Sequence, residues 1–331
     1  GGEMPKVREE EQPSFWDQAP DAIKHLLVQS RAERVHAFAR KVWQANPSFC
    51  DAVDLPFACQ LLGSAYSLTA ALGIELARKW LDPVAPQASL VVALCQSSHE
   101  DARAFGVQCL ITHPSLLAHL TEVTIPLLLT PQILLHQLLR QQLVAQQGQI
   151  LLESVIVALL GLRSNQEAEA AMAIETITIL CAPSFAAVSA DHVQALLDHP
   201  LLVLPLFAVQ ILWAKPIEMV SDAQFFQLCH SPRPELRTAG MQLWNRLTDE
   251  ALLERGALMA DYCVSPQPEL RQGVRPMIER LAAQKSHVLT TVSDVTAKEC
   301  EVFFGRTCDL ILPNGLNVTR FAATHEFQNL H

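Results

Sequence analysis

Five basic side chains recur at one position of a repeating pattern, and they are the residues of this sequence best placed to bind something. They are His36, Arg103, His136, Arg237 and Arg271, each six residues after a recurring Ser or Thr. Aligned along one surface, these side chains would bind an acidic peptide or a nucleic-acid backbone. Alternatively, the three Arg stems bridge neighbouring repeats and pair with an acid two residues earlier: Asp101, Glu235 or Glu269. The presence of that acid favours the second interpretation.

The pattern that positions these side chains has a narrow period. Its recurring residues follow one another at intervals of 32 to 35 residues: Ser30, Ser64, Ser97, Thr130, Ser164, His199, Ser231 and Ser265. A Ser or Thr between two apolar stretches is typical of a helix N-cap, where its hydroxyl accepts a hydrogen bond from a backbone N–H that has no partner in the helix. The sequence therefore predicts capping roles for the seven Ser and Thr residues, while His199 departs from the pattern.

One nine-residue phrase shows the pattern at its clearest. "CHSPRPELR" at 229–237 returns as "CVSPQPELR" at 263–271. In each copy a Pro follows the Ser, where a missing N–H costs nothing, and a Glu places negative charge in the first helical turn. Nine residues past the recurring position several repeats carry a small residue, as at Gly73, Gly106 and Gly240, which predicts close contact between helices.

The segments on both sides of each recurring residue carry apolar residues at helical spacing. Two antiparallel helices per 34 residues, each pair stacked on the next, predict an all-α fold: an α-solenoid of about eight helix pairs over residues 15–282. Residues 1–14 are expected to be a leader or linker. Residues 283–331 leave the pattern, and "DLILPNGLNVTRF" within them predicts a β-hairpin around Asn314-Gly315.

The PELR phrase, followed by a small residue and a Leu, resembles the second helix of HEAT-type repeats, although units of about 34 residues are short for that family. A narrower resemblance covers residues 15–110. "FWDQAPDAIKHLLVQSRAERVHAFARKVWQANPSFCDAV" and "LLGSAYSLTAALGIELARKWLDP" look like the helical region of large bacterial proteins that also carry a WGR module. The WGR motif itself is missing here, so the resemblance implies the helical repeats and a bacterial source but not the module's nucleic-acid chemistry.

Two repeats depart from the rest. The fourth has a Gln-rich second helix, and the sixth contains "PLLVLPLFAVQILW", which is apolar on nearly every face. A helix of the second kind is either fully buried or covered by a partner, and the sequence leaves both open.

Composition limits the remaining possibilities. The nine cysteines include no C-x-x-C pair, which favours reduced thiols in a cytoplasmic protein. The apolar runs are short or interrupted, so no membrane span is expected. The opening "GGEM" suggests residues left over from cloning or a piece of a longer polypeptide.

Chemistry leaves few traces in this sequence. We find no phosphate-binding loop, metalloprotease motif, nucleophile elbow or paired metal-ligand spacing, and His113 with His119 is too isolated to predict a metal site. The chain is therefore expected to use no cofactor and no metal and to have no catalytic residue. HEAT-like DNA glycosylases need a strongly basic face rich in aromatic residues, and a net charge of −10 argues against that activity.

We therefore expect a non-catalytic scaffold. Its partner would be another protein, or another domain of its parent chain, held along a groove. The alternative is a nucleic-acid-binding solenoid in a bacterial DNA-processing or defence assembly, which the net charge of −10 disfavours.

Overall fold

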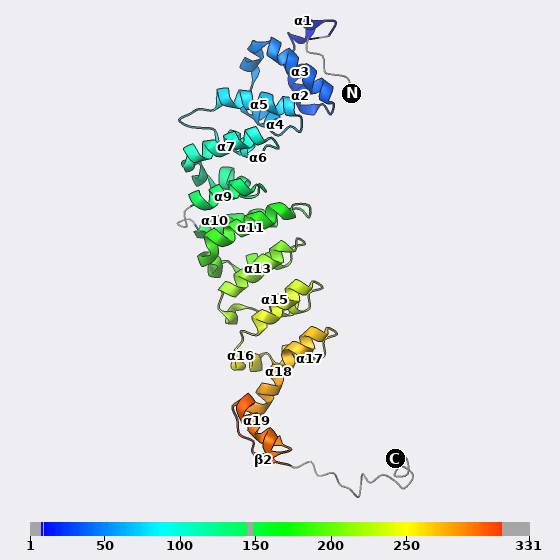
Figure 1. Cartoon of the computed structure of the whole chain (residues 1–331), viewed down its shortest axis with the longest axis vertical. Coiled ribbons are helices and arrows are strands. Elements are labelled where there is room, and N and C mark those ends of the chain that lie inside the picture. Colours follow the sequence, from blue (N-terminus) through cyan, green and yellow to red (C-terminus); the bar gives the residue numbers. More distant parts are fainter. Residues whose placement is uncertain (1–7, 9, 144–147, 313–331) are drawn as a thin grey trace, which may run out of the picture. The chain divides into compact units, whose positions relative to one another are not determined.

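The computed structural model describes residue 8, residues 10–143 and residues 148–312. The chain divides into two compact units, an N-terminal unit that ends at Ala214 and a C-terminal unit that begins at Lys215. Both units are built mostly of helices (Figure 1), as the predicted all-α class requires. The break at Ala214 falls inside the 15–282 region that the sequence pattern treats as continuous.

The N-terminal unit consists of short helices that pack on their neighbours in the chain (Figure 1). Helix α2 contacts α3, α4 contacts α5, α6 contacts α7, α10 contacts α11 and α12 contacts α13. The helices are α1 (Pro13–Trp16), α2 (Pro20–Gln29), α3 (Glu33–Ala45), α4 (Leu55–Leu62), α5 (Ser67–Trp80), α6 (Ala88–Gln96), α7 (Glu100–Thr112), α8 (Ile125–Leu128), α9 (Ile133–Gln142), α10 (Gly148–Leu160), α11 (Glu167–Cys181), α12 (Ala190–Leu197) and α13 (Val203–Ala214).

The fourth repeat is the irregular one. Its first half is a 3₁₀ turn, Pro114–Ala118, a π-helical turn, Leu120–Thr124, and the four-residue α8. The Thr124 hydroxyl donates a hydrogen bond to the carbonyl of Leu117 at 2.8 Å, which ties the two turns together.

Helix α13 settles one question that the sequence leaves open. Leu204, Phe207, Ala208 and Ile211 are fully buried inside the N-terminal unit, so this helix is apolar on most faces because it is a core element. Pro205 is the third residue of α13, in the first turn, where the N–H that it lacks would have no helical partner.

Helix α11 and the turn after it, Glu167–Ala187, are long and apolar enough to cross a membrane by length and composition alone. Within the N-terminal unit α11 contacts α9, α10 and α13, and a core helix of a water-soluble protein has the same composition. The match is therefore weak evidence for a membrane span.

The C-terminal unit begins with helix pairs of the same kind. They are α14 (Asp222–Cys229), α15 (Pro234–Trp244), α16 (Asp249–Glu254), α17 (Gly256–Cys263) and α18 (Pro268–Lys285). Phe225 of α14, Trp244 of α15 and Tyr262 of α17 form a chain of aromatic contacts, with ring centroids 5.2 and 5.0 Å apart. All three side chains are fully buried and make the core of this unit.

Close contact between paired helices explains the recurring glycines. A Cβ added at Gly106 of α7 would lie 2.7 Å from the Cys95 Sγ and 2.8 Å from the Cys95 backbone nitrogen. A Cβ at Gly240 of α15 would lie 2.8 Å from the Leu228 Cβ on α14. The two helices of a pair can approach this closely only where no side chain intervenes, which confirms the predicted role of the small residue.

A different structure follows α18. Strand β1 (Thr290–Thr291) leads into α19 (Asp294–Phe304) and then into β2 (Leu310–Ile311), and the two strands pair in parallel with Thr290 opposite Leu310. We call residues 290–311 the strand–helix–strand segment. Leu310 and Ile311, expected to form the first arm of a hairpin, thus pair with an upstream strand in parallel instead. The predicted turn at Asn314-Gly315 lies outside the described residues.

Candidate functional site

The five basic side chains share one backbone interaction. Each donates a hydrogen bond to the carbonyl oxygen of the recurring residue six positions earlier. These contacts join His36 to Ser30 (3.0 Å), Arg103 to Ser97 (3.1 Å), His136 to Thr130 (3.0 Å), Arg237 to Ser231 (3.0 Å) and Arg271 to Ser265 (2.5 Å). The turn carbonyls would otherwise lack a partner. A side chain at this position therefore stabilises the turn between the two helices of a repeat.

The two histidines are buried, each 1% exposed. The His36 Nε2 donates to the Ser30 carbonyl, and its Nδ1 is hydrogen-bonded to the Thr69 hydroxyl at 2.8 Å. The His36 ring also stacks on Tyr66, with centroids 3.8 Å apart. His36 is thus fully engaged inside the N-terminal unit and offers no surface to a ligand.

His136 repeats the arrangement in the fourth repeat. Its Nδ1 lies 2.8 Å from the Thr176 hydroxyl, which also accepts a hydrogen bond from the Arg140 Nε at 3.1 Å. Burial lowers the pKa of His136, and the nearby Arg140 guanidinium acts in the same direction. Burial therefore favours the neutral imidazole at His136. Because both histidines are buried and hydrogen-bonded, the expected line of five cations on one surface loses two of its members.

The three arginines remain partly accessible, but they do not pair with the expected acids. Among the ion pairs of the described residues, none joins Arg103 to Asp101, Arg237 to Glu235 or Arg271 to Glu269. Both sequence interpretations therefore miss the backbone contact.

Five of the recurring hydroxyls lie two residues before the helix N-cap instead of at the N-cap, where they were expected. Ser30, Ser64, Ser97, Ser231 and Ser265 each accept a hydrogen bond from the backbone N–H two residues later, at 3.1–3.3 Å. The residue that donates is the helix N-cap: Ala32, Tyr66, His99, Arg233 or Gln267. The hydroxyl thus closes the turn before the helix instead of capping the helix itself, as such Ser turns do.

The remaining three repeats differ from these five. The His199 Nδ1 accepts from the Leu201 N–H at 3.2 Å, so the deviant His does the work of the Ser hydroxyl. The Thr130 hydroxyl donates to the Pro126 carbonyl at 2.8 Å. Ser164 precedes α11, whose N-cap is Gln166. Among the described residues, side-chain N-caps lie on the first helix of several repeats, at Asp54, Ser189, Ser221 and Thr248, and at Ser293 before α19.

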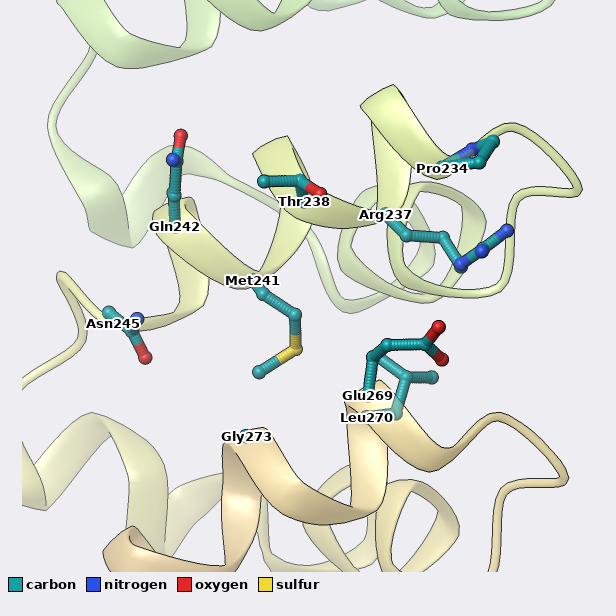
Figure 2. Close-up of a pocket in the computed structure, with 9 residues that line it drawn as sticks. All are labelled: Pro234, Arg237, Thr238, Met241, Gln242, Asn245, Glu269, Leu270 and Gly273. Carbon is teal, nitrogen blue, oxygen red and sulfur yellow. The ribbon is translucent and has the colours of Figure 1, made fainter.

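One surface pocket involves the doubled phrase. It measures about 290 Å³ and lies between α15 and α18 (Figure 2). Figure 2 shows the Met241 side chain pointing from α15 toward Gly273 on α18. A Cβ at Gly273 would lie 2.6 Å from the Met241 Cε, so this glycine makes room for the methionine.

The polar lining of that pocket can bind but lacks the groups for bond-making. The polar residues of the lining are Arg237, Thr238, Gln242, Asn245 and Glu269. Glu269 is the one carboxylate in the lining, which contains no histidine and no cysteine, so the pocket offers no pair of acid–base groups.

The other potentially reactive side chains of the described residues also show no arrangement that suggests catalysis. Among them no group of three or more His, Cys, Asp or Glu side chains could hold a metal ion. All nine cysteines are free. Burial raises the pKa of Cys95 to about 12 and that of Cys229 to about 11, so these thiols stay protonated near neutral pH and are poor nucleophiles.

A second pocket, of about 740 Å³, lies between α16, α17 and α18. Its lining is mostly apolar, with Met259 and Ile278 among the larger side chains and Lys285 at the end of α18. Its lining includes no carboxylate and no histidine, so it lacks the usual groups of acid–base catalysis.

Comparison with known proteins finds a match in the C-terminal part of the chain. Residues 271–331 match the family model described as glycogen synthase. Over 57 residues the chain is 60% identical to glycogen [starch] synthase isoform 1 of Saccharomyces cerevisiae and 53% identical to liver glycogen [starch] synthase of Homo sapiens, covering 17% of this chain and 8% of each relative. The glycogen [starch] synthase of Caenorhabditis elegans is 57% identical over 54 residues, 16% of this chain and 8% of that relative.

These matches are short. The chain spans less than a tenth of the length of the curated relatives it matches. No solved structure matches the chain significantly. The family match begins at Arg271, inside α18, so that helix is shared between the last Ser-containing repeat and the matched segment.

The comparisons overturn several sequence expectations. The glycogen synthase matches contradict the expectation that the chain is not an enzyme, and with it the non-catalytic scaffold and the nucleic-acid-binding alternative. The resemblance to bacterial WGR-module proteins is also wrong, because the relatives found are glycogen synthases of a nematode, of fungi and of mammals. That resemblance rested on residues 15–110, far from the matched segment.

Sequence reasoning overlooked the strand–helix–strand segment, although its signal was present. "LTTV" and "DLIL" are short β-branched and apolar runs on either side of "DVTAKECEVFFG", a helical pattern that ends at a glycine. That order is typical of a parallel β-α-β unit. Asn314-Gly315 suggested a hairpin, which masked it.

Proposed function

We propose that this protein acts in glycogen synthesis as part of a glycosyltransferase of the glycogen synthase type. One observation carries the proposal: 60% identity over 57 residues to a glycogen [starch] synthase. At that level two segments share a backbone fold and most packing contacts. In this proposal residues 271–331 are a piece of the synthase fold, attached to the helical repeats that precede them, with α18 shared between the two parts.

The local structure supports this placement of the segment. Strands β1 and β2 run parallel and are joined through α19, and parallel pairs occur almost only within larger sheets that helices cover on both faces. Sugar transfer needs a carbohydrate acceptor and an activated donor, and enzymes of the α/β class bind such ligands at the carboxyl ends of parallel strands. The segment is a building block of that class.

We further propose that the helix pairs of each unit stack as short HEAT-like solenoid repeats. Contacts between alternate helices support this, since α3 packs on α5 and α4 on α6. A cytoplasmic location fits the nine free thiols, which persist in a reducing compartment. The partner that best suits the proposal is glycogen synthase polypeptide, either in the same parent chain or in a separate one.

Activity of the native protein tests the proposal. Antibodies raised against this chain would recover the protein from its cells, and the recovered material would be given glycogen and ¹⁴C-labelled nucleotide-activated glucose. We expect label to enter glycogen. Material that contains the chain but transfers no label, under conditions in which the yeast enzyme does, would rule the proposal out.

A further inference from the structure

Met241 lies where three helices of the C-terminal unit meet. It belongs to α15, and its thioether contacts a neighbouring helix on each side. The Cys229 Sγ at the end of α14 lies 3.9 Å from the Met241 Sδ and donates a weak hydrogen bond to it. On the other side the Met241 methyl group packs on Gly273 of α18 (Figure 2). One thioether therefore links α14, α15 and α18.

The contacts around this thioether are close. A Cβ at Gly240, next to Met241 on α15, would lie 3.0 Å from the Cys229 Sγ. A Cβ at Gly273 would lie 2.6 Å from the Met241 Cε and 3.8 Å from its Sδ. Glycines at both contacts let α15 approach α14 on one side and α18 on the other. The packing of α18 on α15 thus depends on an apolar side chain at position 241.

The thioether can also be reached from solvent. Met241 lines the surface pocket of about 290 Å³ and is partly exposed, whereas Cys229 is fully buried behind it. Burial raises the pKa of Cys229 to about 11, so this thiol keeps its proton and is a poor nucleophile. A small oxidant that enters the pocket therefore meets the methionine sulfur before the cysteine sulfur.

We propose that Met241 is a redox-sensitive contact, which hydrogen peroxide converts to the sulfoxide and which then releases α18 from α15. In this step a lone pair of the Met241 sulfur attacks one peroxide oxygen, so that an S–O bond forms and the O–O bond breaks. The sulfur is oxidised by two electrons and the peroxide is reduced. The departing hydroxide takes the proton of the transferred oxygen and leaves as water.

The sulfoxide does not suit the position that the thioether occupies. Its oxygen is a polar acceptor, and Gly273 and the weakly donating Cys229 thiol satisfy it less well than water does. The oxidised side chain is more stable when it turns into the pocket, beside the polar groups of Thr238 and Gln242, and α18 then loses its contact with Met241.

This change would reach the matched region, because α18 opens it at Arg271. Loosening of α18 would loosen the support of the strand–helix–strand segment that follows. The switch uses only residues of the C-terminal unit and does not depend on the function proposed above.

Amide hydrogen exchange of the full chain, before and after treatment with hydrogen peroxide, tests the proposal. Peptide mass spectrometry would measure the sulfoxide at each methionine, and dithiothreitol would reverse disulfides formed by the free cysteines. We expect exchange in α18 to become at least tenfold faster as Met241 is oxidised, with exchange in α2 and α3 unchanged. Methionine sulfoxide reductases should restore the slow exchange.

Two results of this experiment would overturn the proposal. One is a Met241 that stays reduced while Met219, which is 65% exposed, is oxidised. The other is an oxidised Met241 with unchanged exchange in α18. Both are read from the unsubstituted chain, so neither depends on how well a variant folds.

Substitutions assign the response to one sulfur. Met241→Leu conserves volume, so the chain should fold, and exchange in its α18 should no longer respond to peroxide. Met219→Leu is the matched control at the exposed methionine and should respond as the unsubstituted chain does. A peroxide response that survives Met241→Leu would show that another group causes it and would contradict the proposal.

Discussion

His136 shows what a single residue contributes to a repeat. Burial lowers the pKa of His136 in the folded state from its ordinary value of 6.5. Below about pH 6.5 the unfolded state therefore binds a proton at this residue more readily than the folded state does. The unfolding free energy should therefore fall as the pH drops below about 6.5. Urea titrations between pH 7.5 and 5.5 would measure how the unfolding free energy changes with pH. The control is His25→Gln, at an exposed histidine, which should leave that dependence unchanged. His136→Gln should flatten the slope, and an unchanged slope in that variant would contradict the assignment.

Gly106 tests the close approach of α6 and α7. Gly106→Ala places a methyl group against the backbone nitrogen of Cys95, which cannot rotate away, and such overpacking costs about 1–3 kcal/mol. We expect that loss in chemical denaturation. Gly63→Ala is the control, because its Cβ would meet only ordinary contacts at 3.6 Å and should stay within about 0.5 kcal/mol. Equal effects at the two sites would refute the packing argument.

At the scale of the element, the turn between paired helices depends on its carbonyl partner. Arg271→Ala removes a charged donor from the Ser265 carbonyl and should cost about 0.5–1.5 kcal/mol, modest because the arginine is exposed. Arg275→Ala is the matched control on the same helix, since it loses only an exposed ion pair with Glu279. Thermal unfolding would rank the two, and a larger loss in the control would show that the turn contact is unimportant.

The attachment of the strand–helix–strand segment depends on Arg306. Arg306→Ala removes the donors that join the end of α18 to Asp309, so amide hydrogen exchange in α19 should speed up while exchange in α14 and α15 stays the same. Exposed Lys298→Ala on α19 should leave exchange unchanged. Uniform exchange across all three variants would mean that the segment is held by other contacts.

Protonation of Asp309 at low pH should weaken the same attachment of the strand–helix–strand segment. The hydrogen bond from the Leu289 N–H, with the Arg306 guanidinium, lowers the pKa of Asp309 in the folded chain. A carboxylate of this kind stabilises the fold above its unfolded pKa, near 3.8, and loses that contribution as the pH falls through its folded value. Exchange in α19 should therefore rise only under strongly acidic conditions, and Asp309→Asn should show the fast exchange already at neutral pH.

These elements also show how far sequence reasoning reaches. The period, the helix pairs and the small residue at Gly106 and Gly240 follow from residue type and spacing, because each depends on contacts within about 34 residues. The role of the sixth residue after each Ser does not, since a side chain such as Arg237 can equally well reach an acid or a carbonyl. The pairing of Thr290 with Leu310 was missed for another reason: the Asn314-Gly315 turn signal favoured a local hairpin over the parallel pairing of the two short runs.

At the scale of the whole molecule, two kinds of structure meet in one chain. Helix pairs fill most of the described residues, and a parallel strand–helix–strand segment with synthase relatives follows them. Helix α18 serves both, because it ends the last repeat and opens the matched region at Arg271. Apolar side chains on α19 indicate that the synthase-like part depends on more polypeptide than the described residues supply.

A segment exchange measures the central claim most directly. Residues 271–331 of this chain, the part that matches the glycogen synthase family model, would replace the equivalent segment of Saccharomyces cerevisiae glycogen synthase isoform 1, and glucose incorporation into glycogen would be compared with the unmodified enzyme. If the segment is a working piece of a glycogen synthase, the exchanged enzyme should fold and keep activity within about tenfold, roughly 1.4 kcal/mol in the transition state. An exchanged enzyme that folds but makes no glycogen would contradict that claim.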